Sequence, residues 1–86
     1  MEDRSFVLVI SERAAEASVQ KIGKALLALD GKGISASRPI QAVLGDVLLG
    51  VRDNVLLKTP LEPADLESLF RTQLGRDFKL CAIQWL

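Results

Sequence analysis

The 86-residue chain contains no histidine, no tyrosine and a single cysteine, Cys81. Without histidine, the most common general base is missing, and neither a Ser-His nor a Cys-His nucleophile can form within one chain. One cysteine cannot form an intrachain disulfide, and without histidine it cannot complete an ordinary zinc site. We therefore expect a protein that is not an enzyme and that holds no metal or cofactor.

The chain also lacks net charge, because eleven Lys and Arg residues balance eleven Asp and Glu residues. Dedicated nucleic-acid-binding domains are commonly basic, so nucleic acid is not the favoured partner. A hydrophobic fraction of 49% combined with zero net charge favours association with other proteins. We expect a protein partner and a homo-oligomer, most simply a homodimer.

Long hydrophobic runs are absent as well. No stretch approaches the roughly 20 apolar residues of a membrane span. The apolar run Phe6–Ile10 is short and follows an acidic N-terminal segment, unlike a signal peptide. The sequence predicts a single domain, residues 1–86, in the cytoplasm and without membrane association.

The first half of the chain predicts a strand and a helix. Phe6–Ile10 is a short β-branched run typical of a buried strand. Ser11 can cap a helix that ends near Leu29, with Glu12 in its first turn. A stripe at helical spacing marks the buried side of this helix, and Gly31 is placed to terminate it. The stripe consists of Ala15, Val19, Ile22, Leu26 and Leu29.

Residues 34–57 allow more than one interpretation. Residues 34–39 suit either an irregular segment or an edge strand. The preferred prediction for the rest is a hairpin that turns at Asp53-Asn54 and pairs 47–52 with 55–59. Residues 40–44 then continue the first of these strands or form a short one. The alternative is a short helix capped by Ser37, since Ile40, Val43, Leu44 and Val47 also fit helical spacing.

The last third of the chain predicts a helix and a strand. Thr59, Pro60 and Glu62 match a capping box, although Pro63 could move the start by one turn. Gly75 ends this helix, and 78–85 reads as the final strand. The buried stripe of the helix consists of Leu66, Leu69, Phe70 and Leu74.

The predicted order is β-α-β-β-α-β. Both helices are amphipathic on one stripe, so we expect an α+β, ferredoxin-like fold with two helices on one face of an antiparallel sheet. This architecture hosts proteins of many functions, and the fold alone therefore does not assign one.

The final strand is apolar on both faces. Cys81, Ile83 and Trp85 alternate with Leu80, Ala82 and Leu86. Helices cover one face only, and a large exposed apolar patch is rare in monomers. We therefore predict a protein-interaction surface at Trp85, Ile83, Cys81 and Leu86, with Trp85 as its anchor.

Three arginines form a second candidate site. The predicted topology gathers Arg13, Arg52 and Arg76 at one end of the sheet, beside Glu12, Asp53 and Asp77. The arginines could receive an anion or a partner's carboxylate, or they could only pair with the nearby acids.

The sequence thus favours a non-catalytic interaction or regulatory module, an adaptor or inhibitor of a larger complex, that self-associates through a hydrophobic sheet face. Two alternatives remain open. One is a nucleic-acid or nucleotide-binding module that uses Arg13, Arg52 and Arg76. The other is a small carboxylate-dependent enzyme that uses Glu12.

Overall fold

The computed structural model describes residues 3–36, 38–50 and 53–86, apart from the side chains of Leu44 and Leu48. It contains three strands, three α-helices and one 3-10 helix. In chain order these are β1 (Arg4–Ile10), α1 (Glu16–Leu29), α2 (Ile40–Leu48), β2 (Asn54–Thr59), α3 (Pro63–Leu74), η1 (Gly75–Leu80) and β3 (Cys81–Trp85).

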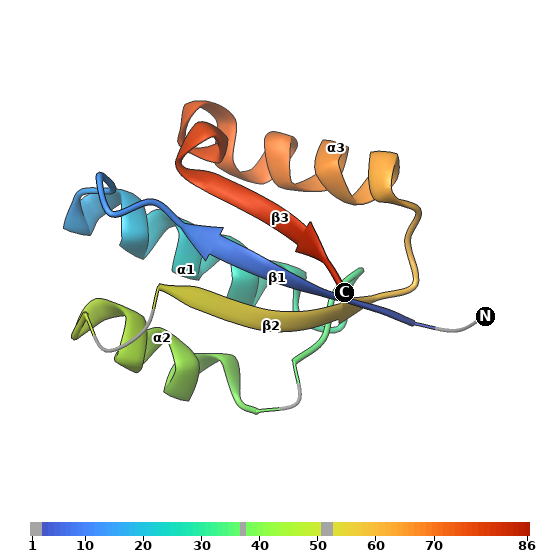
Figure 1. The fold of residues 1–86 in the computed structure, drawn as a ribbon, viewed down its shortest axis with the longest axis horizontal. Helices are drawn as coiled ribbons and strands as arrows, with labels where there is room; N and C mark the ends of the chain where they lie inside the picture. The colour runs from blue at the N-terminus through green and yellow to red at the C-terminus, as the bar shows by residue number, and fades with distance from the viewer. Residues whose placement is uncertain (1–2, 37, 51–52) are drawn as a thin grey trace.

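The three strands form one antiparallel sheet with the order β2-β1-β3, so the first strand lies in the middle (Figure 1). Phe6 is opposite Leu57 on β2 and opposite Trp85 on β3. Because β1 is antiparallel to both neighbours, β2 and β3 run in the same direction. Helix α3 makes the crossover between them, as two parallel strands require.

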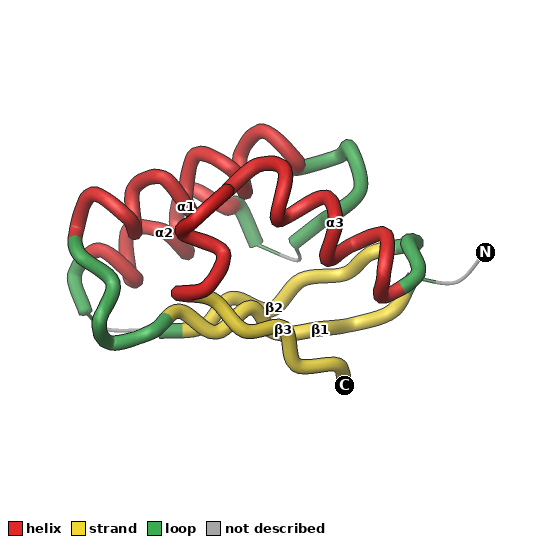
Figure 2. Tube along the Cα trace, turned by 90° about the horizontal axis from the view of Figure 1, so that it is seen from above, coloured by secondary structure: helices red, strands yellow, loops and turns green. Residues whose placement is uncertain are grey.

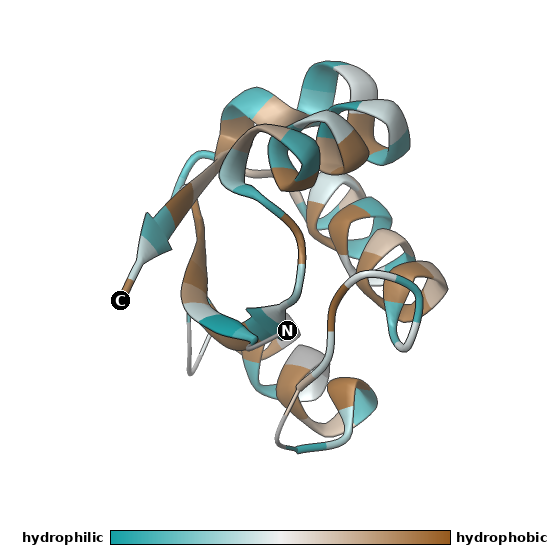
Figure 3. Ribbon diagram, turned by 90° about the vertical axis from the view of Figure 1, so that its right-hand side faces the viewer, coloured by the Kyte–Doolittle hydropathy of each residue, from teal (hydrophilic) through white to brown (hydrophobic). Residues whose placement is uncertain are grey.

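All three helices lie on the same side of the sheet (Figure 2), so the fold has two layers. Helix α1 contacts both α2 and α3, and α3 continues into η1. Hydrophobic and hydrophilic residues alternate around the helices (Figure 3), as expected for helices with one buried side. The opposite side of the sheet carries no helix from the described part of the chain.

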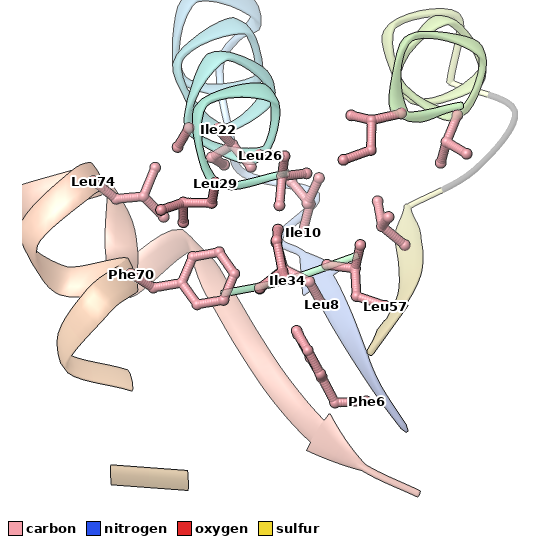
Figure 4. Packing of buried hydrophobic residues seen from close by; sticks show 14 of the residues in the cluster. Phe6, Leu8, Ile10, Ile22, Leu26, Leu29, Ile34, Leu57, Phe70 and Leu74 are labelled. Carbon is pink, nitrogen blue, oxygen red and sulfur yellow. The ribbon is translucent and has the colours of Figure 1, made fainter. Parts of the chain in front are cut away.

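The hydrophobic core fills the space between the two layers (Figure 4). Phe6 from the central strand and Phe70 from α3 are fully buried, and their rings meet edge to face at 6.3 Å between centroids. Such aromatic pairs add stability beyond the area that they bury. The core therefore connects the middle of the sheet directly to α3.

The α+β class, the antiparallel sheet and the buried stripes of α1 and α3 are confirmed. Ile22, Leu26 and Leu29 are buried in α1, whereas Val19 is half-buried and Ala15 is exposed. Leu66, Phe70 and Leu74 are buried in α3, and Leu69 packs against the core. Gly31 and Gly75 follow α1 and α3 with φ of 78° and 55°, in the left-handed region that favours glycine.

The predicted start of the first helix is wrong. Helix α1 begins at Glu16, and no side chain caps it. The Ser11 Oγ accepts a hydrogen bond from the Arg13 backbone N–H at 3.1 Å, and the Ala14 N–H donates to the Ser11 carbonyl. Ser11 thus closes a turn that precedes the helix, a local use of serine that competes with capping.

The preferred hairpin over residues 47–59 is also wrong, and with it the ferredoxin-like order. Ile40–Leu48 is a helix, the alternative interpretation, and the observed order is β-α-α-β-α-β. Ile40, Val43 and Val47 are all buried in α2. Their spacings of three and four residues place them on one side of a helix but on both faces of a strand, so only the helix buries all three. Ser37, the proposed cap, lies outside the described residues.

Thr59 ends β2 and does not cap α3. Helix α3 starts at Pro63, the alternative that the second proline suggested. Thr59 is fully buried, and its Oγ1 donates to the Gly33 carbonyl at 2.6 Å and accepts from the Leu61 N–H at 3.1 Å. One hydroxyl therefore joins the end of β2 to the two loops beside it.

We predict that Thr59→Val lowers the free energy of unfolding by about 1–3 kcal/mol, because it leaves two half-buried backbone groups without their partner at nearly constant volume. Chemical denaturation measures the change. Thr72→Val is the matched control, since Thr72 is exposed and its hydroxyl bonds only to its own helix. Equal losses in the two variants would contradict this role for Thr59.

Candidate protein-interaction site

The two faces of the sheet differ in their surroundings. Phe6 and Leu8 on β1, together with Val55 and Leu57 on β2, point toward the helices and are buried. Side chains alternate along a strand, so the intervening residues point the other way. We call that second surface the open face. It consists of Ser5, Val7, Val9, Asn54, Leu56, Lys58, Ala82 and Gln84.

The pairing register arranges the open face in rows across the sheet. Leu56, Val7 and Gln84 form one row, and Asn54, Val9 and Ala82 form the next. The centre of the open face is therefore apolar: Val7 and Val9 are half-buried between their neighbours, while Leu56 is 49% exposed.

Polar side chains surround this apolar centre. Asn54 and Gln84 complete the two central rows, and Lys58 pairs with Ser5 at the next position. An apolar centre with a polar rim is the usual composition of a protein-protein contact.

The structure divides the predicted interaction residues between the two faces. Cys81 and Ile83 point toward the helices and pack against the core. Trp85 lies on the same side, 5.4 Å from the Phe6 ring and 37% exposed. Leu86 is 78% exposed and follows Ala82 and Gln84 in the alternation, and the chain leaves the sheet on the side away from the helices (Figure 2).

Sequence reasoning did not single out Val7, Val9, Leu56 and Ala82. A signal for the first two was present, because Phe6–Ile10 is apolar at every position and a helix layer covers only alternate residues. Leu56 and Ala82 follow only from the register between strands. That register depends on β1 lying between β2 and β3.

Among the described residues, no strand or bridge covers the outer edge of β3. The Ser11 N–H donates to Leu80, and the Leu86 N–H donates to Ser5. In an antiparallel ladder every second residue directs its backbone N–H and C=O groups toward the neighbouring strand, so Ala82 and Gln84 also bond to β1. The backbone groups of Cys81, Ile83 and Trp85 then point outward.

A shallow hollow lies beside this edge. It is lined by Pro63 and Glu67 of α3, by Phe78 of η1 and by residues of β3 including Ile83 and Trp85. The outward side of β3 is thus bordered by α3.

Two of the three arginines of the second candidate site lie in the described part of the chain. Arg13 and Arg76 are exposed, and the turns that carry them lie at the same end of the sheet (Figure 1). Arg52 lies outside the described residues. The nearby acid Asp77 is bonded to Lys21 at 3.2 Å and to the Ser18 hydroxyl at 3.3 Å. Asp77 therefore pairs with α1.

Glu12 lies at the rim of a hollow of about 420 Å³ at this end of the sheet. Glu16 and Asp53 line the same hollow, whose walls include Ile10 and Val47. Within the described part of the chain, no three Asp, Glu, Cys or His residues are close enough together to hold a metal ion. The hollow combines acidic and apolar walls.

Comparison of the chain with protein-family models, with curated proteins and with solved structures found no match. Among the residues that the structure describes, no helix has the length and apolar character needed to cross a membrane.

Cys81 is a half-buried side chain whose chemistry depends on its surroundings. Burial raises the pKa of its thiol to about 11, and the negative charge of Asp77 adds to this effect. The thiol is therefore protonated at neutral pH, and a protonated thiol is a poor nucleophile.

We predict that the Cys81 thiol destabilises the fold at alkaline pH. The pKa of the thiol is raised in the folded state. The stability that the protonated thiol contributes is therefore fully present below the ordinary pKa of 9.0, where the thiol is protonated in both the folded and the unfolded chain. It is lost progressively between pH 9 and about 11, because the unfolded chain releases its proton first. Denaturation of the native chain and of Cys81→Ala at several pH values measures the difference. A constant difference from pH 8 to 11 would contradict this prediction.

Proposed function

We propose that the protein is a non-catalytic interaction module that docks another protein on the open face of its sheet. The observation that carries the proposal is the uncovered apolar centre at Val7, Val9 and Leu56, opposite the layer of helices. A partner that covers this centre removes Leu56 from water and leaves the polar rim hydrated. The module would act as an adaptor or an inhibitor within a larger complex.

The size of the open face limits what it can do alone. Three strands about 4.8 Å apart, with about five residues each at 3.4 Å, give roughly 240 Å² in plan. A stable interface buries on the order of 800 Å² on each partner. Two open faces packed together therefore provide too little area for a strong homodimer, and self-association needs further contact at the edge of the sheet.

The alternative functions have less support. On the open face Lys58 is the single cation, and no aromatic side chain is present for stacking with bases. At the other end of the sheet, Glu12, Glu16 and Asp53 line the hollow, and their negative charge opposes an anion there. Glu12 is exposed, without the enclosed surroundings that usually tune a catalytic carboxylate.

We expect Leu56→Lys to weaken partner binding at least tenfold, because docking would bury an unpaired ammonium group against apolar atoms. The immobilised protein captures partners from an extract of its own cells, and titration gives the affinity of each. Leu27→Lys is the matched control, since Leu27 is 42% exposed on α1, in the helix layer.

A partner that native protein and Leu27→Lys retain equally, and that Leu56→Lys loses, supports docking on the open face. The same set of proteins retained by all three forms contradicts it. Circular dichroism checks that both substituted chains keep the native fold.

A further inference from the structure

We propose that two copies of this chain pair through the outer edges of β3 and join their sheets into one sheet of six strands. The inference rests on the proposed function, because it specifies how the interaction module self-associates. Its site differs from the open face, and the two can therefore be tested separately.

The backbone of β3 supplies the first argument. Its outward N–H and C=O groups belong to Cys81, Ile83 and Trp85, and the Cys81 N–H is already bonded to the Phe78 carbonyl. No described residue pairs with the outward groups of Ile83 and Trp85. Such a row of free donors and acceptors is a template for another strand.

The other edge of the sheet provides a contrast. On the outer side of β2, the Ser35 N–H donates to the Lys58 carbonyl at 2.9 Å, and the Lys58 N–H donates to the Ser35 carbonyl at 2.8 Å. This bridge lies near the C-terminal end of β2, and the exposed Lys58 side chain adds a charge there. Strand β3 has neither feature.

The sequence of β3 lacks the devices that usually protect an edge. The segment 81–86 contains no charged side chain and no proline, and it includes Ile83 and Trp85, which favour strands. An incoming strand therefore meets no charge on β3 itself, and a second copy with zero net charge approaches without a long-range barrier.

The occupant that we propose for this edge is β3 of a second copy, related to the first by a two-fold axis at Ile83. Ile83 then pairs with its own equivalent, and Cys81 lies opposite Trp85 of the other copy. Four backbone hydrogen bonds form: two between the Ile83 residues and two from Trp85 N–H groups to Cys81 carbonyls. The occupied Cys81 N–H is not needed.

The same register places apolar side chains together on the open side. Leu86, which is 78% exposed, comes opposite Leu80 of the other copy, and Ala82 comes opposite Gln84. The two open faces also become continuous, so the surface offered to a foreign partner doubles. Edge pairing thus enlarges the small area of a single open face to roughly 480 Å² in plan.

The first experiment is a measurement of mass by light scattering over a concentration series. We expect the native chain to become a dimer as concentration rises. Ile83→Pro should raise the dimer dissociation constant more than tenfold, because the substitution removes one Ile83 N–H donor from each copy and thus two hydrogen bonds from the dimer. Ile83→Val, which keeps the N–H group, should remain a dimer. Proline is tolerated where a strand's N–H points away from the sheet.

The second experiment tests the register with cysteines placed on the open face, in chains whose native thiol is removed. Cys81→Ala chains carrying either Ala82→Cys or Gln84→Cys are mixed and oxidised mildly. In the proposed register these two positions form a non-hydrogen-bonded pair about 4.5 Å apart at Cα, close enough for a disulfide. We expect the mixed disulfide to form at least tenfold faster than either homodimeric one.

Three outcomes would overturn the inference. A native chain that stays monomeric at every concentration excludes pairing between copies. Preferential crosslinking of Gln84→Cys with itself excludes the axis at Ile83. A dimer that Leu56→Lys dissociates and Ile83→Pro does not would place self-association on the open face. If Leu56→Lys loses the foreign partner but remains a dimer, docking uses the open face and self-association uses the edge, as proposed.

Discussion

The structure depends on the pairing of β1 on both of its sides. Phe6 and Leu8 lie opposite residues of β2 and of β3, so the backbone of this strand is bonded in both directions. The same two side chains are fully buried and contribute to the core under the helices. Because β2 and β3 contact β1 and not each other, the sheet exists only through its first strand. Helix α3 then packs on that strand through the contact between Phe70 and Phe6.

The position of β1 also determines what the surface offers. Once alternate residues of β1 face the helices, the register fixes which residues of its neighbours share each face. Leu56 becomes exposed and Leu57 buried for this reason, although both are leucines in one strand. In the same way Ile83 packs inward beside Leu8, while Ala82 faces outward beside Val9. The surface that we propose for docking is therefore a consequence of strand pairing more than of the composition of any single segment.

Local patterns predicted those parts of the fold that one segment specifies by itself. The stripes of α1 and α3 and the glycines that follow them depend on residues a few positions apart, and they were confirmed. Residues 40–48 were mistaken for strand because a short apolar run fits both periods, and Asp53-Asn54 resembles a hairpin turn, whereas the strand predicted at 55–59 was confirmed. The spacing of Ile40, Val43 and Val47 contained the correct answer, but only packing against α1 selects it. The open face depends on register, which a single strand's sequence does not specify.

The replacement of a predicted strand by α2 has a consequence for association. A fourth strand would have covered the outer edge of β2 along its length, whereas the bridge between Ser35 and Lys58 covers only the part near its C-terminal end. Of the two edges, β3 is the one that carries neither a charged side chain nor a bridge to another described segment. A molecule with two such edges would add copies at both and form open fibres. With one such edge, pairing about a two-fold axis satisfies both copies and ends at a dimer. An uncharged strand like β3 is tolerable for this reason, since the contact that it favours closes on itself.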